Sequence, residues 1–221
     1  MIRLEELSVF FGRTIALDGL DAAIEPGITG VFGPNGSGKS TLLRVVAGLL
    51  APSAGRVTFE GASVSTADEG FAGRLGYAGH DAGLYSRLTV RENLELFAHL
   101  HGRPRSDAET YIEHLALQEH ERTLAGVLSA GLKRRAAVAR ALVHQPDLLL
   151  LDEPYANLDD DAAELVSGAL KQWWKPGRVA LVATHGAKKL KAFAHAGLIL
   201  KRGRIAVEGS YRERPEVGTR T

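Results

Sequence analysis

The sequence predicts an α/β protein with a mostly parallel core sheet, an antiparallel β part near the N-terminus and an inserted helical subdomain. Two continuous apolar runs, Leu148–Leu151 and Val179–Thr184, are typical of parallel strands covered on both faces. Short strands separated by turn residues occupy the chain up to about Glu60. The middle of the chain changes to helical periodicity, so the sheet is expected to be built from both ends of the chain.

The N-terminal part is expected to contain short strands. Glycine and proline favour turns between them, as at Gly12 and Pro26. Apolar residues then recur at helical spacing from Leu42 to Leu49, which predicts a helix directly after the third strand. The expected strands are Ile2–Val9, Ala16–Ile24, Gly30–Phe32 and Val57–Phe59.

The central segment is expected to form three helices. The first opens with a capping box, Thr89–Glu92, and can end at Gly102. The second begins at Ser106, where acidic residues occupy the first turn. The third runs from about Gly131 to His144. These helices would enclose most of their apolar residues against the sheet.

The C-terminal part returns to the sheet. A helix is expected between the acidic run Asp159–Asp161 and the Trp173–Trp174 pair, with one indole ring packed inward. Leu198–Leu200 and Ile205–Val207 flank a polar turn and predict a hairpin. One domain is therefore expected over 1–221, with a catalytic core from 1–81 and 145–211, a helical subdomain at 82–144 and a polar tail at 212–221.

Composition excludes several functional classes. Lys plus Arg number 27 against 26 for Asp plus Glu, so no overall charge favours nucleic acid as a partner. The cluster Lys133–Arg135 is expected to be a solvated helix face. There is no cysteine, and no apolar stretch approaches the roughly 18 residues of a membrane span. A cytoplasmic protein is expected.

One motif carries most of the functional information. It has the pattern G-x-x-x-x-G-K-[ST] and lies between an expected strand and an expected helix, as a phosphate-binding loop requires. Its glycines allow backbone N–H groups to surround phosphate oxygens, and Lys39 would bridge the β and γ phosphates. The Ser40 hydroxyl would ligate magnesium. The motif consists of Gly33, Pro34, Asn35, Gly36, Ser37, Gly38, Lys39, Ser40 and Thr41.

A second motif places two carboxylates after a buried strand. Asp152 and Glu153 follow the run Leu148–Leu151, and open α/β sheets bind ligands at this end of their strands. Asp152 is expected to hold magnesium, and Glu153 is then free to polarise the water that attacks the γ phosphate. Together with the phosphate loop, this pair indicates ATP hydrolysis with Mg²⁺.

The chain resembles the nucleotide-binding subunits of ABC transporters over nearly its full length. In place of the family's L-S-G-G-Q signature it has Leu128-Ser129-Ala130-Gly131-Leu132. The resemblance implies that the Ser129 hydroxyl and the Gly131 amide meet ATP held by a second subunit. Read from the residues alone, Ser129 is a helix N-cap. Leu132 departs from the family pattern because it replaces a polar amide.

Three further positions match the family. Asn157-Leu158-Asp159 resembles the loop through which the two sites of a dimer sense each other, so Asp159 is expected near the nucleotide of the pair. His185 resembles the switch histidine that contacts the γ phosphate and orients Glu153. Phe11 matches the aromatic residue that stacks on adenine, with a plain core aromatic as the alternative.

His80 is the informative departure. Most relatives have glutamine there, close to magnesium and water, and an imidazole can fill that polar role through one ring nitrogen. The Gly79–His80 pair, the Leu-Ser-Ala-Gly signature and Arg134, Arg135 and Arg140 most resemble the ATP-binding subunit of the heme exporter of cytochrome c maturation. Another small ABC exporter is the alternative.

The resemblance therefore implies a magnesium-dependent ATPase that works as a head-to-tail dimer with a second copy of itself. Its other partners would be integral membrane transporter subunits, which would hold it on the inner face of the cell membrane. The docking segment would be the loop from His80 to Tyr85 and the helical subdomain that follows. A soluble ABC protein without a transporter and a regulatory nucleotide-binding module remain the competing interpretations.

Overall fold

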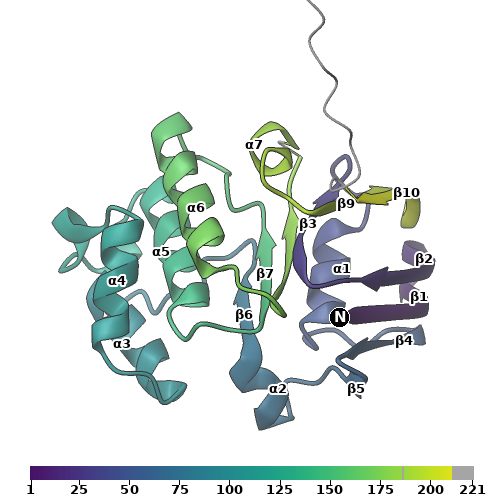
Figure 1. Ribbon diagram of the computed structural model, residues 1–221, viewed down its shortest axis with the longest axis horizontal. Coiled ribbons are helices and arrows are strands. Elements are labelled where there is room, and N and C mark those ends of the chain that lie inside the picture. The colour runs from purple at the N-terminus through teal and green to yellow at the C-terminus, as the bar shows by residue number, and fades with distance from the viewer. Residues whose placement is uncertain (186, 211–221) are drawn as a thin grey trace, which may run out of the picture.

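The computed structural model describes residues 1–185 and 187–210, and the polar tail expected from 212 lies outside them. Figure 1 shows two sheets side by side, with one helix between them and a layer of helices on the far side of the larger sheet. The expected architecture is confirmed: an antiparallel sheet near the N-terminus, a mostly parallel sheet, and a helical part between the two halves of the latter.

The smaller sheet is antiparallel and has the order β2-β1-β4-β5. In the centre of this sheet, Leu4 of β1 pairs with Ala22 on one side and with Val57 on the other. β1 and β2 each extend by two residues beyond their expected ends at the turn that joins them. The strands are β1 (Ile2–Phe11), β2 (Thr14–Ile24), β4 (Ala54–Phe59) and β5 (Ala62–Ser63).

The larger sheet has the order β10-β9-β3-β8-β7-β6, and only β10 runs antiparallel to its neighbour. The sequence did not predict β6, which is short and begins Leu75-Gly76. A Cβ on Gly76 would lie 2.2 Å from the Ala141 carbonyl oxygen, so glycine permits the close approach of a helix here. The strands are β3 (Gly27–Phe32), β6 (Leu75–Ala78), β7 (Leu148–Asp152), β8 (Val179–Ala183), β9 (Ala196–Lys201) and β10 (Arg204–Ser210).

The continuous apolar runs are explained by two cores, one on each face of this sheet. Leu148 and Leu150 point into the core shared with the smaller sheet, whereas Leu149 and Leu151 point into the core shared with the helical layer. Because successive strand residues alternate between faces, a strand between two cores must be apolar at every position.

The expected helices are present, and two short helices, α2 and α7, were not predicted. α1 packs between the two sheets, and α3, α4, α5 and α6 form the layer on the opposite face (Figure 1). The capping box of Thr89 and Glu92 is present at the start of α3. The helices are α1 (Lys39–Val46), α2 (Glu69–Arg74), α3 (Val90–Leu100), α4 (Ser106–His114), α5 (Ala130–Leu142), α6 (Asp160–Trp173) and α7 (Ala187–Lys191), with 3-10 turns at Gln118–His120 and Ala125–Val127.

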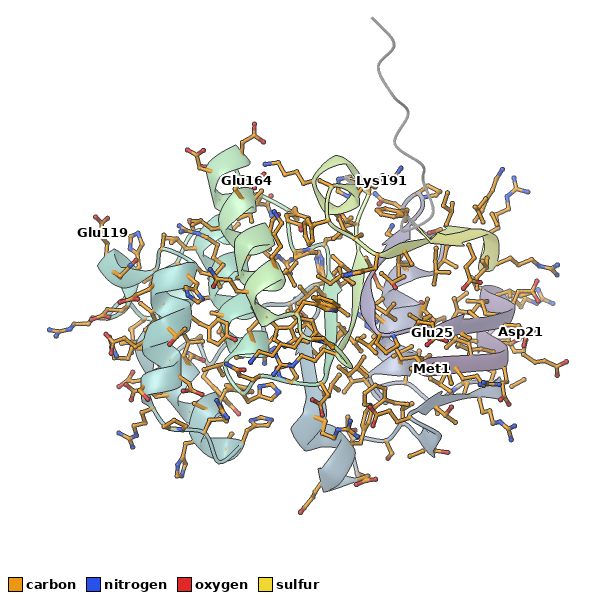
Figure 2. All side chains as sticks on the ribbon, viewed as in Figure 1. Met1, Asp21, Glu25, Glu119, Glu164 and Lys191 are labelled. Atoms are coloured by element: carbon orange, nitrogen blue, oxygen red, sulfur yellow. The ribbon has the colours of Figure 1, made fainter. Side chains whose placement is uncertain are left out.

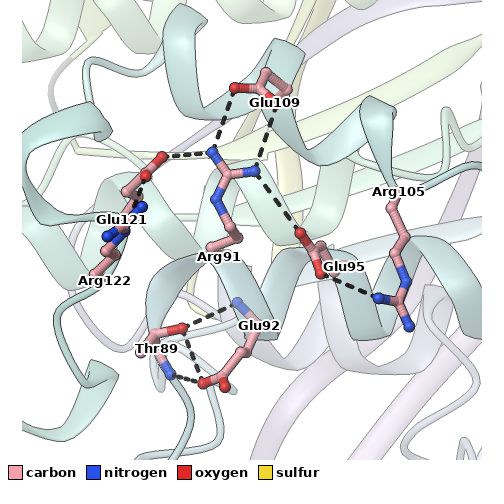
Figure 3. A network of polar contacts seen from close by, with 8 residues as sticks. All are labelled: Thr89, Arg91, Glu92, Glu95, Arg105, Glu109, Glu121 and Arg122. Carbon is pink, nitrogen blue, oxygen red and sulfur yellow. Dashed lines mark hydrogen bonds and ion pairs between the residues drawn. The ribbon is translucent and has the colours of Figure 1, made fainter.

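Arg91 of α3 ties the outer helices together (Figure 3). Its guanidinium donates to Glu109 of α4 at 3.3 Å and to Glu121, which follows the first 3-10 turn, at 2.5 Å. Glu95, one turn further along α3, lies 3.7 Å away and also faces Arg105. The hydrogen bonds to Glu121 and Glu109 raise the pKa of Arg91. The network therefore fixes α4 and the following turn against α3.

The expectation that Lys133, Arg134 and Arg135 form a solvated face is wrong. Arg134 is only 8% exposed, and the Lys133 ammonium donates to the Gly126 carbonyl at 3.0 Å. All three are long side chains that donate to main-chain carbonyls of neighbouring segments. The basic residues at the start of α5 therefore hold neighbouring segments against this helix by hydrogen bonds.

Trp173 confirms that one indole ring of the pair packs inward. It is 2% exposed, and its Nε1 donates to the Pro146 carbonyl at 3.0 Å. Charged side chains such as Glu119 and Glu164 project outward from the helical layer instead (Figure 2). Among the residues that the structure describes, no helix combines the length and the apolar character that a membrane span requires.

Candidate functional site

A cleft of about 620 Å³ lies at the carboxyl edge of the larger sheet, where β7 and β8 end. The parallel register places Asp152 of β7 level with Ala183 of β8, so the residues that follow these strands meet at one edge. Of the residues predicted for the site, the cleft is lined by Asn35, Gly36, Gly38, Lys39, Ser40, Thr41, His80, Asp152, Glu153 and His185.

The phosphate loop connects β3 to α1, as expected. Gly33 has φ +149°, and a Cβ there would lie 2.3 Å from the Leu200 carbonyl oxygen. Gly38 has φ +106°, and its Cβ would lie 2.7 Å from the Ala16 carbonyl oxygen. Both positions therefore require glycine, which lets the loop curl tightly beside β2 and β9. Ser37 is buried under the loop, and Pro34 is exposed at its outer side.

The first turn of α1 is suited to an anion. Its N-cap residue, Gly38, provides no side-chain cap, and the first turn carries no acidic residue. The N–H groups of this turn therefore lack a side-chain cap and form the positive end of the helix dipole. The Lys39 ammonium donates to the carbonyls of Gly33 at 2.9 Å and Pro34 at 3.2 Å, so it lies across the mouth of the loop. This arrangement can bind phosphate oxygens.

Asp152 provides a test of whether magnesium fits. Its side chain is 3% exposed, and its Oδ1 has no hydrogen-bond partner among the described residues. A buried carboxylate oxygen without a partner is costly, and a hard cation would satisfy it. Ser40 adds a hydroxyl oxygen in the same cleft, whereas the His80 imidazole offers nitrogen, which magnesium accepts less readily. Asp152 and Ser40 therefore fit magnesium.

Glu153 and His185 lie side by side. The His185 Nδ1 is 3.0 Å from Oε2 of Glu153, and the His185 backbone N–H donates to the same carboxylate at 3.1 Å. Glu153 has φ +50°, a left-handed conformation that turns the chain sharply after β7. The Lys39 ammonium approaches its other oxygen to 3.9 Å. The carboxylate is therefore held between a cation and an imidazole.

Seven predicted residues are absent from the lining of this cleft: Gly33, Pro34 and Ser37 of the phosphate loop, and Phe11, Ser129, Gly131 and Asp159. Ser129 accepts a hydrogen bond from the Leu132 N–H at 3.3 Å and is the N-cap of α5. Asp159 accepts from the Ala162 N–H at 2.8 Å and is the N-cap of α6. Neither Gly131 nor Phe11 lines the cleft, and Phe11 is 51% exposed.

Gly131 and the segment before α6 are in close contact. A Cβ on Gly131 would lie 2.9 Å from the Asn157 carbonyl oxygen. The signature segment and the loop that ends at Asp159 therefore form one surface beside the cleft. Leu132 is partly buried and packs against the core of the helical layer.

Sequence reasoning missed the wall of the cleft that β2 provides. Thr14, Ile15 and Ala16 line it, and Ile15 is 54% exposed. Thr14 pairs with Phe11 across the β1–β2 turn, so the expected adenine-stacking residue lies next to this wall. The available signal was the apolar residue Ile15, three residues after Gly12. Arg44 of α1 and Ala156 also line the cleft and were not predicted.

A second cavity of about 320 Å³ lies at the opposite end of β3, around Gly27 and His195. It contains none of the predicted residues.

The comparisons with known proteins agree with the site. Residues 17–156 match the family model described as ABC transporter. The chain is 31% identical over 201 residues to the ABC transporter ATP-binding protein NatA of Bacillus subtilis, covering 88% of this chain and 82% of the relative. It is 38% identical over 185 residues to the cytochrome c biogenesis ATP-binding export protein CcmA of Roseobacter denitrificans, covering 83% and 84%. It is 32% identical over 216 residues to the Nod factor export ATP-binding protein I of Burkholderia thailandensis, covering 96% and 71%.

Solved structures give the same answer. The dimeric structure of a bacterial ABC transporter cassette is 26% identical and superimposes with a TM-score of 0.87, covering 95% of this chain and 98% of that one. A dimeric post-hydrolysis state of an ATP-binding cassette, bound to ADP and Pi, gives a TM-score of 0.86 at 26% identity, with the same coverage.

Proposed function

This chain belongs to the ABC transporter family as an ATP-binding, ATP-hydrolysing subunit, and we propose that it works as a magnesium-dependent dimer that drives export across a membrane. One observation carries the proposal: Lys39, the adjacent carboxylates Asp152 and Glu153, and His185 come from three separate segments and meet in one cleft. This combination provides a phosphate anchor, an oxygen ligand for a cation and a base.

Each residue has a defined task. The phosphate loop and Lys39 hold the β and γ phosphates of ATP. Glu153 accepts a proton from the attacking water, while His185 orients the carboxylate through its backbone N–H and its Nδ1 and lies beside the γ phosphate. The bond between the γ phosphorus and its bridging oxygen breaks, and ADP and inorganic phosphate leave. Magnesium, held by Ser40 and Asp152, would neutralise phosphate charge. His80, which lines the same cleft, would contact the magnesium through a bound water molecule.

The dimer is supported by what lies outside the cleft. Ser129 and Gly131 do not line the cleft of their own chain, although the family places them at ATP. They lie on one surface with the loop before α6, as a site completed by a second copy requires. The two solved relatives described above are dimers. ATP is therefore proposed to join two copies head to tail, with Phe11 or the adjacent β2 wall on the adenine and Asp159 at the shared surface.

The membrane partner is proposed to dock beside the His80 loop, on the inner face of the membrane. A groove of about 170 Å³ is lined by Leu49, Tyr77 and Phe97 and by Arg140, whose Nη1 donates to the Gly83 carbonyl of this loop. Leu49, Tyr85 and Leu100 are each more than half exposed and surround this region with apolar surface. An integral membrane subunit could cover this surface.

The identity of the exported substrate is the most specific part of the proposal. Heme export for cytochrome c maturation is supported by Gly79–His80, by the Leu-Ser-Ala-Gly signature and by the 38% identity to a cytochrome c biogenesis export protein. Another small exporter is the second candidate, because relatives named for Nod factor export and daunorubicin resistance match at 32% and 35%.

Recovery of the partner tests the transporter. The tagged chain should retain a polytopic protein from mildly solubilised membranes, and Asp81→Lys with Arg87→Glu should reduce this recovery without weakening ATP binding, since both side chains are exposed beside the loop. Glu119→Lys, at the outer edge of the helical layer, is the control (Figure 2). Recovery of only nucleic-acid partners, with ATPase activity that responds to RNA or DNA, would contradict the transporter. Sequencing of the recovered membrane protein distinguishes heme export from other export.

A further inference from the structure

Arg134 joins three parts of the site by its side chain. It lies on α5, one turn beyond the signature residues, and is 8% exposed. Its Nη1 donates to the carbonyls of Gly79 at 2.8 Å and Asp152 at 3.3 Å, and its Nη2 donates to the carbonyl of His80 at 3.1 Å. One guanidinium therefore connects the signature helix, the His80 loop and the end of β7.

The positive charge of Arg134 lies close to three carboxylates. Burial lowers the pKa of Arg134, and the nearby charges of Asp152, Glu153 and Asp81 oppose that effect. An arginine stays protonated in proteins, so a buried cation lies behind the acidic side of the cleft. Because Arg134 does not line the cleft, it acts on the site only through the main chain that it holds.

Arg140 holds the same loop further along α5. Its Nη2 donates to the Tyr77 carbonyl at 2.6 Å, and its Nη1 donates to the Gly83 carbonyl at 3.0 Å. A Cβ on Gly83, which has φ +61°, would lie 2.8 Å from this Nη1. Carbonyls on both sides of His80 are thus bound to one helix, so the position of the loop is set by α5.

We propose that Arg134 is a positioning residue that couples the two ATP sites of the dimer. It fixes the His80 loop, at the γ-phosphate end of its own cleft, to the helix whose first residues meet the ATP of the second copy. The coupling rests on the proposed dimer, whereas the positioning of the loop does not. Arginine is required because its planar fork reaches three acceptors at once, whereas a lysine ammonium is a single point of charge.

A matched pair of variants tests this role. Arg134→Lys keeps the charge but loses the fork. Arg135→Lys makes the same change at the next residue, whose Nη1 donates to the carbonyls of Leu115 and Ala116 at the end of α4 and not to the loop. Hydrogen exchange in the nucleotide-free protein should be about tenfold faster over 79–84 in Arg134→Lys and unchanged there in Arg135→Lys.

Kinetics test the coupling. We expect Arg134→Lys to bind ATP within about twofold of wild type, because the phosphate loop is intact. Its kcat should fall about 10- to 100-fold, since the loop is displaced, and its Hill coefficient for ATP should fall toward about 1. Arg135→Lys should retain the wild-type kcat and Hill coefficient.

The outcomes separate the two proposals. Loop exchange and kinetics in Arg134→Lys that equal those of Arg135→Lys would overturn the assignment of Arg134. Faster loop exchange with an unchanged Hill coefficient would overturn the coupling and keep the positioning. A wild-type protein that binds ATP but stays monomeric would overturn the proposed dimer and the coupling together, while loop exchange still decides the positioning by itself.

Discussion

The Nδ1 of His185 lies 3.0 Å from Oε2 of Glu153, although the two residues follow different strands. The contact forms because β7 and β8 are neighbours and end at the same edge of the sheet. The His185 backbone N–H donates to the same carboxylate, so the position of Glu153 is fixed twice. A base oriented in this way is ready to accept a proton from a water molecule in the cleft.

His185 is expected to serve hydrolysis and not ATP binding. His185→Ala should lower kcat about 10²- to 10³-fold, because the base loses its orienting partner. ATP affinity should change by no more than about twofold, since the phosphate loop is untouched. Phosphate release and equilibrium binding measure the two effects. His99→Ala, exposed on α3, is the control, and a His185→Ala protein with the turnover of His99→Ala would contradict the role.

Lys39, in contrast to His185, is expected to serve ATP binding. Its ammonium lies at the mouth of the phosphate loop, where it would bind two phosphates by charge-assisted hydrogen bonds. Lys39→Ala should weaken ATP binding about 100-fold, which corresponds to about 3 kcal/mol. Isothermal titration with ATP measures this change. Lys171→Ala on α6 is the matched loss of a lysine, and equal affinities for the two variants would remove Lys39 from the site.

Ser129 allows its two possible roles to be separated. As an N-cap it can be replaced by aspartate, which caps equally well, whereas alanine should cost about 1 kcal/mol of stability. If Ser129 is instead a ligand of the second copy's γ phosphate, aspartate cannot replace it, because a carboxylate would repel the anion. Ser129→Asp should therefore keep the wild-type melting temperature but lose ATP-dependent dimerisation. A Ser129→Asp protein that still dimerises would show that Ser129 is only a cap.

His144 is expected to make folding depend on pH. Burial lowers its pKa to about 4, with a smaller contribution from the charge of His101, whose ring stacks on it at 3.9 Å. The Nε2 of His144 is bonded to the Leu75 carbonyl at 3.0 Å, and its Nδ1 is buried without a partner among the described residues. A proton on that nitrogen would have no acceptor in the fold.

The sign follows from which state binds the proton first. An unfolded histidine titrates near about 6.5, so the unfolded chain takes up the proton before the folded chain does as the pH falls. Stability is therefore independent of this group above about pH 6.5, and it falls between about 6.5 and about 4 by on the order of 3 kcal/mol. The free energy of unfolding, measured with denaturant at several pH values in this range, should fall less steeply with decreasing pH for His144→Gln than for His99→Gln. Equal slopes would contradict the prediction.

The sequence was sufficient where the physical cause is local. Leu148–Leu151 predicted a strand covered on both faces, because only such a strand is apolar at every position. The phosphate loop is evident from its glycines, because the main-chain conformation at Gly33 and Gly38 permits only glycine. Asp152 could be located because it directly follows its strand.

The sequence was insufficient where the cause lies in contacts between distant segments. The run of basic residues around Arg134 predicts a solvated face, because nothing nearby in the chain shows that its acceptors belong to Gly79, His80 and Asp152. Asn93 is similar: it is fully buried, and it bonds to the N–H and the carbonyl of Tyr85. Buried polar residues of this kind become visible only when the fold is known.

Glu153→Gln provides the most direct test of the account, because it removes the proposed base and keeps the shape of the side chain. Phosphate release and light scattering should be measured on the same protein with and without ATP and magnesium. The account predicts that hydrolysis falls at least about 100-fold while ATP converts the protein to a stable dimer. A variant with wild-type turnover, or one that binds ATP and remains a monomer at high concentration, would contradict it.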